Sequence, residues 1–205
     1  MAQMSQKELV LQYLSEAHAL ETALVTNLGA HSTMTPSGTY KTLLDRHRKT
    51  TEEHAAAVEK RINELGADCD RGIVAKAAEL ARDAVGQALV LTKGPIDMVR
   101  GSGVNEKLLK NAKDECATEA LEIATYQALE TLATAVGDSK TAQLAVRHRE
   151  QEERMLDDLR RLLPSLTIAA VRSLAAGHST YDSASTGAAD ILRRAREKAA
   201  EVGIR

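Results

Sequence analysis

Aromatic side chains are nearly absent from this chain of 205 residues, which has four tyrosines and neither phenylalanine nor tryptophan. A hydrophobic core must therefore be built from leucine, alanine, valine and isoleucine. Such residues favour helices that pack closely through small side chains. The composition predicts an all-α protein.

Features that define several other classes of protein are also missing. The two cysteines, Cys69 and Cys116, form neither a disulfide framework nor a Cys-x-x-Cys pair, and the first ten residues lack the layout of a signal peptide, so we expect a cytoplasmic protein. The formal net charge of -2, with both signs interspersed, gives no electrostatic basis for binding nucleic acid or an acidic membrane. No apolar run approaches the length of about 18 residues that a membrane-spanning helix needs. The motifs of nucleotide enzymes, nucleophilic hydrolases and zinc modules do not occur.

Four segments carry apolar residues at helical spacing and predict four bundle helices: residues 5–30, 39–65, 105–136 and 140–163. The intervening turns at 31–38 and 137–140 are short, so we expect two antiparallel hairpins. The connection between the hairpins, residues 67–103, is long enough for a crossover with a helix of its own. This connectivity is that of a ferritin-like antiparallel four-helix bundle.

The C-terminal part of the chain predicts a separate appendage. Pro164 suits a first helical position and predicts the start of a short further helix. We expect the bundle domain to cover residues 1–176, a flexible linker 177–187, and an amphipathic tail helix 188–205. The tail helix would dock on its own bundle, on a partner subunit or on another protein.

Polar residues interrupt the apolar stripes near the middle of all four predicted helices. The inward-facing set is Glu21, His54, Glu119, Glu122 and Glu152. A buried, unpaired carboxylate costs several kcal/mol unless it is paired, hydrogen-bonded, protonated or bound to a cation. Antiparallel hairpins bring the middles of the helices into one layer, where carboxylates and imidazole together suit iron or manganese. The pattern predicts an iron or manganese site with these five residues as ligands.

Two other interpretations of the same residues stay open. One is a buried polar network without metal that also includes His47, Thr51, His148 and Tyr126. The other is an error in the assumed helix register. We expect His47 and His148 to pack beside the ligands rather than to be ligands themselves.

The ligand set also falls short of a regular di-iron site. Di-iron bundles use a Glu-x-x-His motif on two helices, whereas this chain has Thr51-x-x-His54 and Glu152-x-x-Met155. Five candidate ligands stand where six are usual, so a weakened, single-metal or empty site is an alternative. On the third helix we place Cys116 inward and expect Glu115 to be solvated.

Four stretches together resemble the ferritin-like stress-protein family of the bacterial YciE/YciF type. They are LSEAHALETAL (14–24), HRKTTEEHAAAVEKRINELG (47–66), EALEIATYQALETLATAVGD (119–138) and EQEERMLDDL (150–159). The resemblance covers roughly residues 8–163 and implies an often dimeric bundle that holds a non-haem di-iron or di-manganese centre. The implied ligands are Glu21, His54, Glu119, Glu122 and Glu152. The chain departs from the family pattern at Thr50 and Gln151, where an acid is usual, and at Ala120 and Leu121.

Two functions follow as expectations. The first is a metal-binding bundle in stress response or in oxidative and metal homeostasis, acting as a non-haem di-metal oxidoreductase on iron or peroxide. The second is a metal-free structural or interaction protein whose tail helix mediates assembly. In either case we expect a homo-oligomer, a dimer or larger, with a protein partner for the tail helix.

Overall fold

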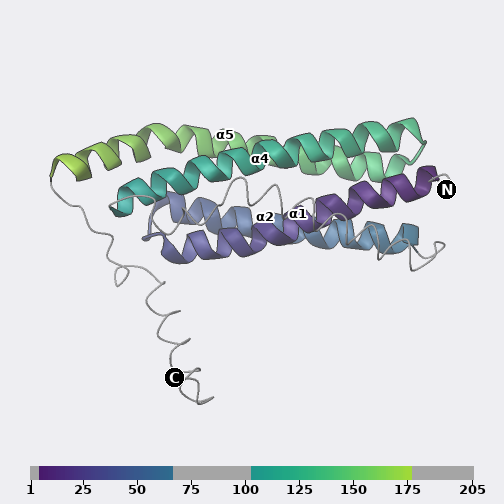
Figure 1. The fold of residues 1–205 in the computed structure, drawn as a ribbon, viewed down its shortest axis with the longest axis horizontal. Helices are drawn as coiled ribbons and strands as arrows, with labels where there is room; N and C mark the ends of the chain where they lie inside the picture. Colours follow the sequence, from purple (N-terminus) through teal and green to yellow (C-terminus); the bar gives the residue numbers. More distant parts are fainter. Residues whose placement is uncertain (1–4, 67–102, 177–205) are drawn as a thin grey trace, which may run out of the picture.

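The computed structural model describes residues 5–66 and 103–176, and these residues form four long α-helices (Figure 1). The helices are α1 (Gln6–Met34), α2 (Thr39–Gly66), α4 (Val104–Ala135) and α5 (Ser139–Ala175). The described part of the chain contains no strand. The predicted all-α four-helix bundle is confirmed. The predicted crossover helix, linker and tail helix lie outside the described residues.

The helices form two antiparallel hairpins, α1–α2 and α4–α5, that pack against each other through α1 with α4 and α2 with α5. Figure 1 shows α2 and α4 running in the same direction, so Gly66 and Val104 lie at opposite ends of the bundle. A parallel arrangement of α2 and α4 is the one expected of two hairpins joined by a long crossover. None of the described helices contains a stretch long and apolar enough to cross a membrane.

Local sequence explains where the helices begin and turn. The Ser5 hydroxyl accepts a hydrogen bond from the Glu8 backbone N–H, and the Glu8 carboxylate accepts one from the Ser5 backbone N–H, which makes a capping box. At the α4–α5 turn, Gly137 adopts φ +78°, a left-handed conformation that glycine adopts without steric cost. The N–H groups of Gly137 and Asp138 then satisfy the last carbonyls of α4.

Asp138 caps α5 and joins it to α2. Its carboxylate accepts hydrogen bonds from the Thr141 backbone N–H at 3.1 Å and hydroxyl at 2.6 Å, and from the Arg61 guanidinium of α2 at 2.8 Å. Burial alone raises the pKa of Asp138, but these hydrogen bonds outweigh it and lower the pKa. The stabilisation is thus present at neutral pH and is lost as the pH falls through the folded pKa of this carboxyl.

Pro164 does not begin a new helix, contrary to the prediction. Helix α5 runs through Pro164 without a break and spans 37 residues in all, Ser139–Ala175. Proline removes one backbone hydrogen bond and normally kinks or ends a helix. Here Leu162 and Leu163 before it, and Leu166 after it, pack on the same apolar cluster, and this burial holds both segments in one helical register.

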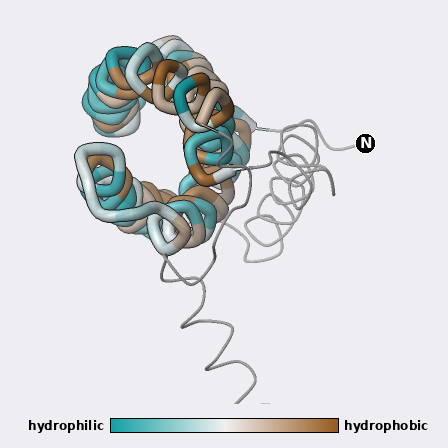
Figure 2. The backbone as a smooth tube through the Cα atoms, turned by 90° about the vertical axis from the view of Figure 1, so that its left-hand side faces the viewer, coloured by the Kyte–Doolittle hydropathy of each residue, from teal (hydrophilic) through white to brown (hydrophobic). Residues whose placement is uncertain are grey.

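Two apolar clusters fill the ends of the bundle interior. Near the α4–α5 turn the cluster contains Val10, Leu14, Ala17, Val58, Tyr126, Leu129, Leu144 and Ala145. Near the α1–α2 turn it contains Leu28, Tyr40, Leu43, Leu44, Ala112, Met155 and Leu159. In the end-on view of Figure 2, hydrophobic and hydrophilic residues alternate along the helices that surround this interior. The level between the two clusters is polar and holds the candidate site.

Replacing Asp138 with alanine should lower the free energy of unfolding by about 1–2 kcal/mol, because α5 loses its cap and Arg61 loses its acceptor. Urea unfolding followed by circular dichroism at pH 7 measures the change. The control is Asp157→Ala, at an exposed position on the same helix, which should change stability little. Equal losses in the two variants would contradict this role of Asp138.

Candidate metal centre

Seven acidic and histidine side chains form one buried layer halfway along the bundle. They are Glu21 on α1, His47 and His54 on α2, Glu119 and Glu122 on α4, and His148 and Glu152 on α5. Spacings of three, four or seven residues place the members from one helix on its inward face. Glu119 and Glu122 are wholly inaccessible to solvent, and the most exposed member, His148, is only 5% exposed.

The ligand atoms of the layer fall into two groups. Glu21, His54 and His148 form one group, and His47, Glu119, Glu122 and Glu152 form the other; within each, one ligand atom per residue lies within 4.8 Å of the others. All five residues predicted from the sequence belong to these groups. The fold thus gathers them from four helices into one place.

Glu152 lies between the two groups. Its Oε1 is 2.6 Å from His54 Nδ1, and its Oε2 is 4.0 Å from His47 Nε2. Each histidine also faces a second carboxylate: His47 Nε2 is 2.9 Å from Glu119 Oε1, and His54 Nδ1 is 3.4 Å from Glu21 Oε1. The two oxygens of one carboxylate therefore face two different imidazoles, one from each ligand group.

Neighbouring side chains orient the ligand atoms. Gln151 Oε1 lies 3.0 Å from His54 Nε2 and accepts its proton, while Nδ1 of the same ring faces Glu21 and Glu152. The Tyr126 hydroxyl donates a hydrogen bond to Glu21. The His148 ring stacks on His54, with ring centroids 3.9 Å apart, and meets the edge of Tyr126 at 5.0 Å. These contacts limit the rotation of both rings.

The carboxylates of the layer have lost their hydration and have too few hydrogen-bond partners to replace it. All four oxygens of Glu119 and Glu122 are buried and accept no hydrogen bond from the described residues, since the 2.9 Å contact of Glu119 Oε1 with His47 Nε2 lacks hydrogen-bond geometry. Burial, together with the neighbouring Glu152 and Glu21 charges, raises the pKa of both carboxyls well above the usual value. Burial also raises the pKa of Glu21. Leaving charged oxygens in this state costs several kcal/mol, which a bound cation would remove.

Burial disfavours the charged form of all three histidines, but their pKa values shift in different directions. Burial lowers the pKa of His47, and burial with the nearby His54 and Arg147 charges lowers the pKa of His148 to about 3, so both rings are neutral at pH 7. Burial also disfavours the charged form of His54, but its contacts with Glu152 and Glu21 outweigh this and raise its pKa to about 10. Neutral imidazole is the form that binds a metal ion.

The sequence prediction missed some of this arrangement. Glu115, expected to be solvated, is only 2% exposed and pairs with His31 of α1, whereas Cys116, expected to point inward, is half-buried. The strict seven-residue count that connects Glu115 with Glu122 gives the correct face. His47 and His148, expected to pack beside the ligands, contribute nitrogens to the two ligand groups. Their spacing of seven from His54 and four from Glu152 was the available signal.

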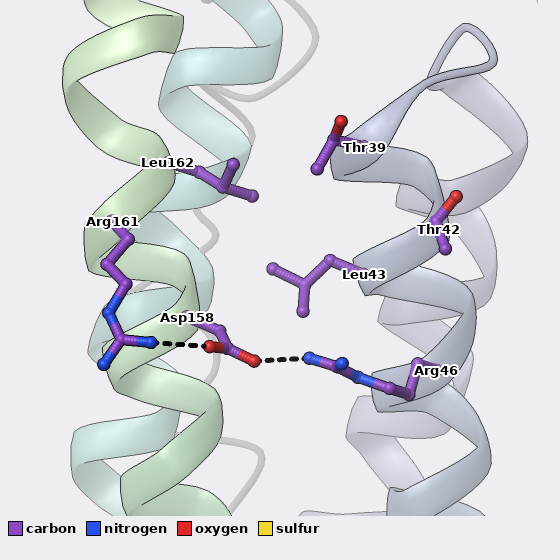
Figure 3. Close-up of a pocket in the computed structure, with 7 residues that line it drawn as sticks. All are labelled: Thr39, Thr42, Leu43, Arg46, Asp158, Arg161 and Leu162. Carbon is purple, nitrogen blue, oxygen red and sulfur yellow. Dashed lines mark hydrogen bonds and ion pairs between the residues drawn. The ribbon is translucent and has the colours of Figure 1, made fainter.

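A groove on the described surface lies elsewhere, between α2 and α5 (Figure 3). It has a volume of about 510 Å³ and is lined by Thr39, Thr42, Leu43, Arg46, Asp158, Arg161 and Leu162. Asp158 of α5 pairs with Arg46 of α2 across this groove and with Arg161 of its own helix. These exposed pairs stabilise the fold by at most about 1 kcal/mol. No residue of the buried layer lines the groove, so it is not the candidate centre.

Fold and site define the class of protein: a four-helix bundle with a buried carboxylate and histidine centre that could hold a metal. The chain belongs to the family described as a domain of unknown function (DUF892), whose model matches residues 5–172. It is also similar to the crystal structure of a protein from Xanthomonas campestris pv. campestris, with 19% identity and a TM-score of 0.63 over 83% of this chain and 99% of that one. At this identity the likeness shows the fold alone. No curated protein matches the chain.

Replacing Glu122 with glutamine should stabilise the metal-free protein, and increasingly so at higher pH. A raised carboxyl pKa means that the folded state holds the proton longer than the unfolded state does. The wild-type protein therefore loses stability as the pH rises above the unfolded pKa, by up to about 1.4 kcal/mol per pH unit, and the glutamine variant lacks this loss.

Urea unfolding of both proteins in chelator, between pH 5 and pH 8, measures the difference. Glu53→Gln, at an exposed site on α2, is the control and should show no such trend. A stability difference between Glu122→Gln and wild type that does not change with pH would contradict the electrostatic strain described above.

Proposed function

We propose that the protein binds iron or manganese in the buried layer. One observation carries this proposal: Glu119 and Glu122 present four buried carboxylate oxygens without a hydrogen-bond partner among the described residues, beside neutral imidazoles. Oxygen and imidazole ligands suit these metals better than they suit soft, thiolate-seeking ions. The residues that would hold the metal are Glu21, His54, Glu119, Glu122 and Glu152, the five predicted from the sequence.

Charge and geometry favour a dinuclear centre. Four carboxylates would balance the charge of two divalent cations once the metal has displaced the second proton of His54. The two ligand groups supply one place for each cation, and Glu152 faces both. His47 and His148 would complete the set. His47 lies one turn before Thr51, which stands where one Glu-x-x-His motif has its Glu, and His148 lies two turns before Met155, which stands where the other motif has its His.

Bound iron or manganese would supply one-electron redox chemistry toward oxygen or peroxide. The protein would exclude bulk water through the apolar clusters on both sides, and Tyr126 would hold Glu21 by its hydroxyl proton. The resemblance to YciE/YciF-type stress proteins supports a role in oxidative stress or metal homeostasis. We therefore propose a non-haem di-metal protein that handles iron, manganese or peroxide.

The purified protein, reconstituted anaerobically with Fe²⁺ or with Mn²⁺, should retain up to two metal ions per chain after desalting. The double variant Glu119→Ala/Glu122→Ala should lose most of this metal, because it removes four of the available oxygens. Elemental analysis and native mass spectrometry measure the content. Glu53→Ala is the matched control and should bind like wild type. Wild-type protein that retains almost no metal, or a double variant that retains all of it, would contradict the proposal.

A second candidate function, assembly into an oligomer, is favoured by a different observation. Ile168, Val171 and Leu174 form an apolar stripe on the C-terminal end of α5 and are 51%, 61% and 73% exposed. Three such side chains on one helical face are typical of an interaction surface. We propose that this stripe contributes to the contact between copies of the chain or with its tail helix.

Replacing Val171 and Leu174 with aspartate should reduce the oligomer size measured by sedimentation velocity, because the charges would be desolvated in the contact. The control Ser165→Asp alters an exposed polar residue of the same helix, about a third of a turn away from Val171, and should leave the assembly intact. If the double variant sediments as wild type does, the stripe plays no part in assembly.

A further inference from the structure

Glu115 is a buried carboxylate that the proposed centre does not use. It lies on α4 one turn before Glu119, is 2% exposed, and one of its oxygens contacts His31 Nδ1 of α1. Its other oxygen, Oε2, is buried and has no hydrogen-bond partner among the described residues. The pair with His31 therefore satisfies one oxygen of Glu115 and leaves the other both without a partner and out of contact with solvent.

The polar side chains along α4 connect the centre with the surface. Glu115, Glu119 and Glu122 are spaced by four and three residues, so they line one face with about 5–6 Å between successive side chains. The exposed fraction of the side chain rises from 0% at Glu119 through 2% at Glu115 to 12% at His31. These four residues are therefore a polar line that begins in the buried layer and ends at the partly exposed ring of His31.

The bundle axis at this end is apolar. Leu28, Leu44 and Leu159 fill the axis and are fully buried. A hydrated cation that crossed this cluster would have to leave its water ligands without replacement, which costs far more than a stepwise exchange of water for carboxylate and imidazole. The seam between α1 and α4 offers such an exchange, because His31 lies on α1 and Glu115 on α4.

The charge of Glu115 also destabilises the metal-free bundle, which a purely structural role would not explain. Its charge is one of the causes that raise the pKa of Glu119 and Glu122, so it adds to the repulsion inside the metal-free bundle. A negative charge at the mouth of a negative site attracts cations and raises their local concentration.

We propose that His31 and Glu115 form an outer cation site, at which divalent metal ions bind briefly before they pass to Glu119 and the buried centre. The ligand is a hydrated divalent cation, held by one imidazole nitrogen, one or both carboxylate oxygens and its remaining waters. This inference rests on the proposed function, because the cation's destination is the centre. It adds a separate role for two residues outside the five predicted ligands.

The test is the rate of metal uptake, measured apart from the amount of metal bound. Metal-free protein is mixed with limiting Mn²⁺, uptake is stopped at intervals with excess chelator, and the protein-bound metal is counted after desalting. Glu115→Gln keeps the shape of the side chain and removes its charge. We expect uptake about tenfold or more slower, with the final metal content unchanged, and a slower rate in the same direction for His31→Gln.

Glu130→Gln is the matched control, since it removes one acidic charge from the same helix at a partly exposed site that pairs with Arg149. It should load at the wild-type rate. A Glu115→Gln variant that also loads at that rate would overturn the outer site. A variant that loses final capacity would overturn it too, by making Glu115 a ligand of the centre.

Folding of each variant is checked by circular dichroism. Should Glu115→Gln not fold, His31→Gln decides alone, because His31 is partly exposed: a wild-type rate overturns the proposal and a slower rate supports it. Wild-type protein that takes up no metal would overturn the proposed function itself. The failure of the proposed function, no metal uptake by the wild-type protein, can thus be told apart from the failure of the outer site, an unchanged uptake rate in the variants.

Discussion

The interior of this bundle is governed by the burial of four carboxylates at one level. In a medium of low dielectric constant, charged carboxylates that lie this close repel one another and have lost their hydration, so at least some must be protonated, paired with an imidazolium or bound to a cation. His54 provides the one strong positive partner, between Glu21 and Glu152. Glu119 and Glu122 have no comparable partner, and the centre can be stable and fully charged only with added positive charge.

The rest of the fold offsets the unfavourable free energy of burying these carboxylates. Two leucine-rich clusters pack above and below the polar layer and supply the favourable burial of apolar surface. The capping box at Ser5 and the network of Asp138, Thr141 and Arg61 fix the ends of the helices. Because long helices joined by short turns cannot easily slide past one another, the seven polar side chains stay in register. A preformed layer of this kind gives up little conformational entropy when a metal binds.

Much of this architecture could be predicted from the sequence, and the failures have physical causes. The hairpins and the five inward acidic and histidine residues follow from helical periodicity, which is a local property. Pro164 was misjudged because the local cost of a proline is outweighed by leucines that pack on both sides of it. Glu115 was wrongly expected in solvent because adjacent residues differ by only about 100° around a helix, and how far each is buried depends on how α1 approaches α4; Cys116 beside it is half-buried against the apolar cluster. The closeness of His47 and His148 to the carboxylates could not be predicted, because these distances depend on the vertical register of four separate helices.

The sequence by itself determined the four helices of the described residues, their pairing into hairpins and the presence of carboxylates on inward faces, since each depends on spacing along one helix and on turn residues. Tertiary structure decided which atoms meet: that Glu152 faces two histidines, that Gln151 contacts His54, and that His31 reaches Glu115 across 84 positions of the chain. These contacts depend on the relative rotation and translation of packed helices. That placement is set by the sum of many side-chain contacts between elements, which no single segment of sequence contains.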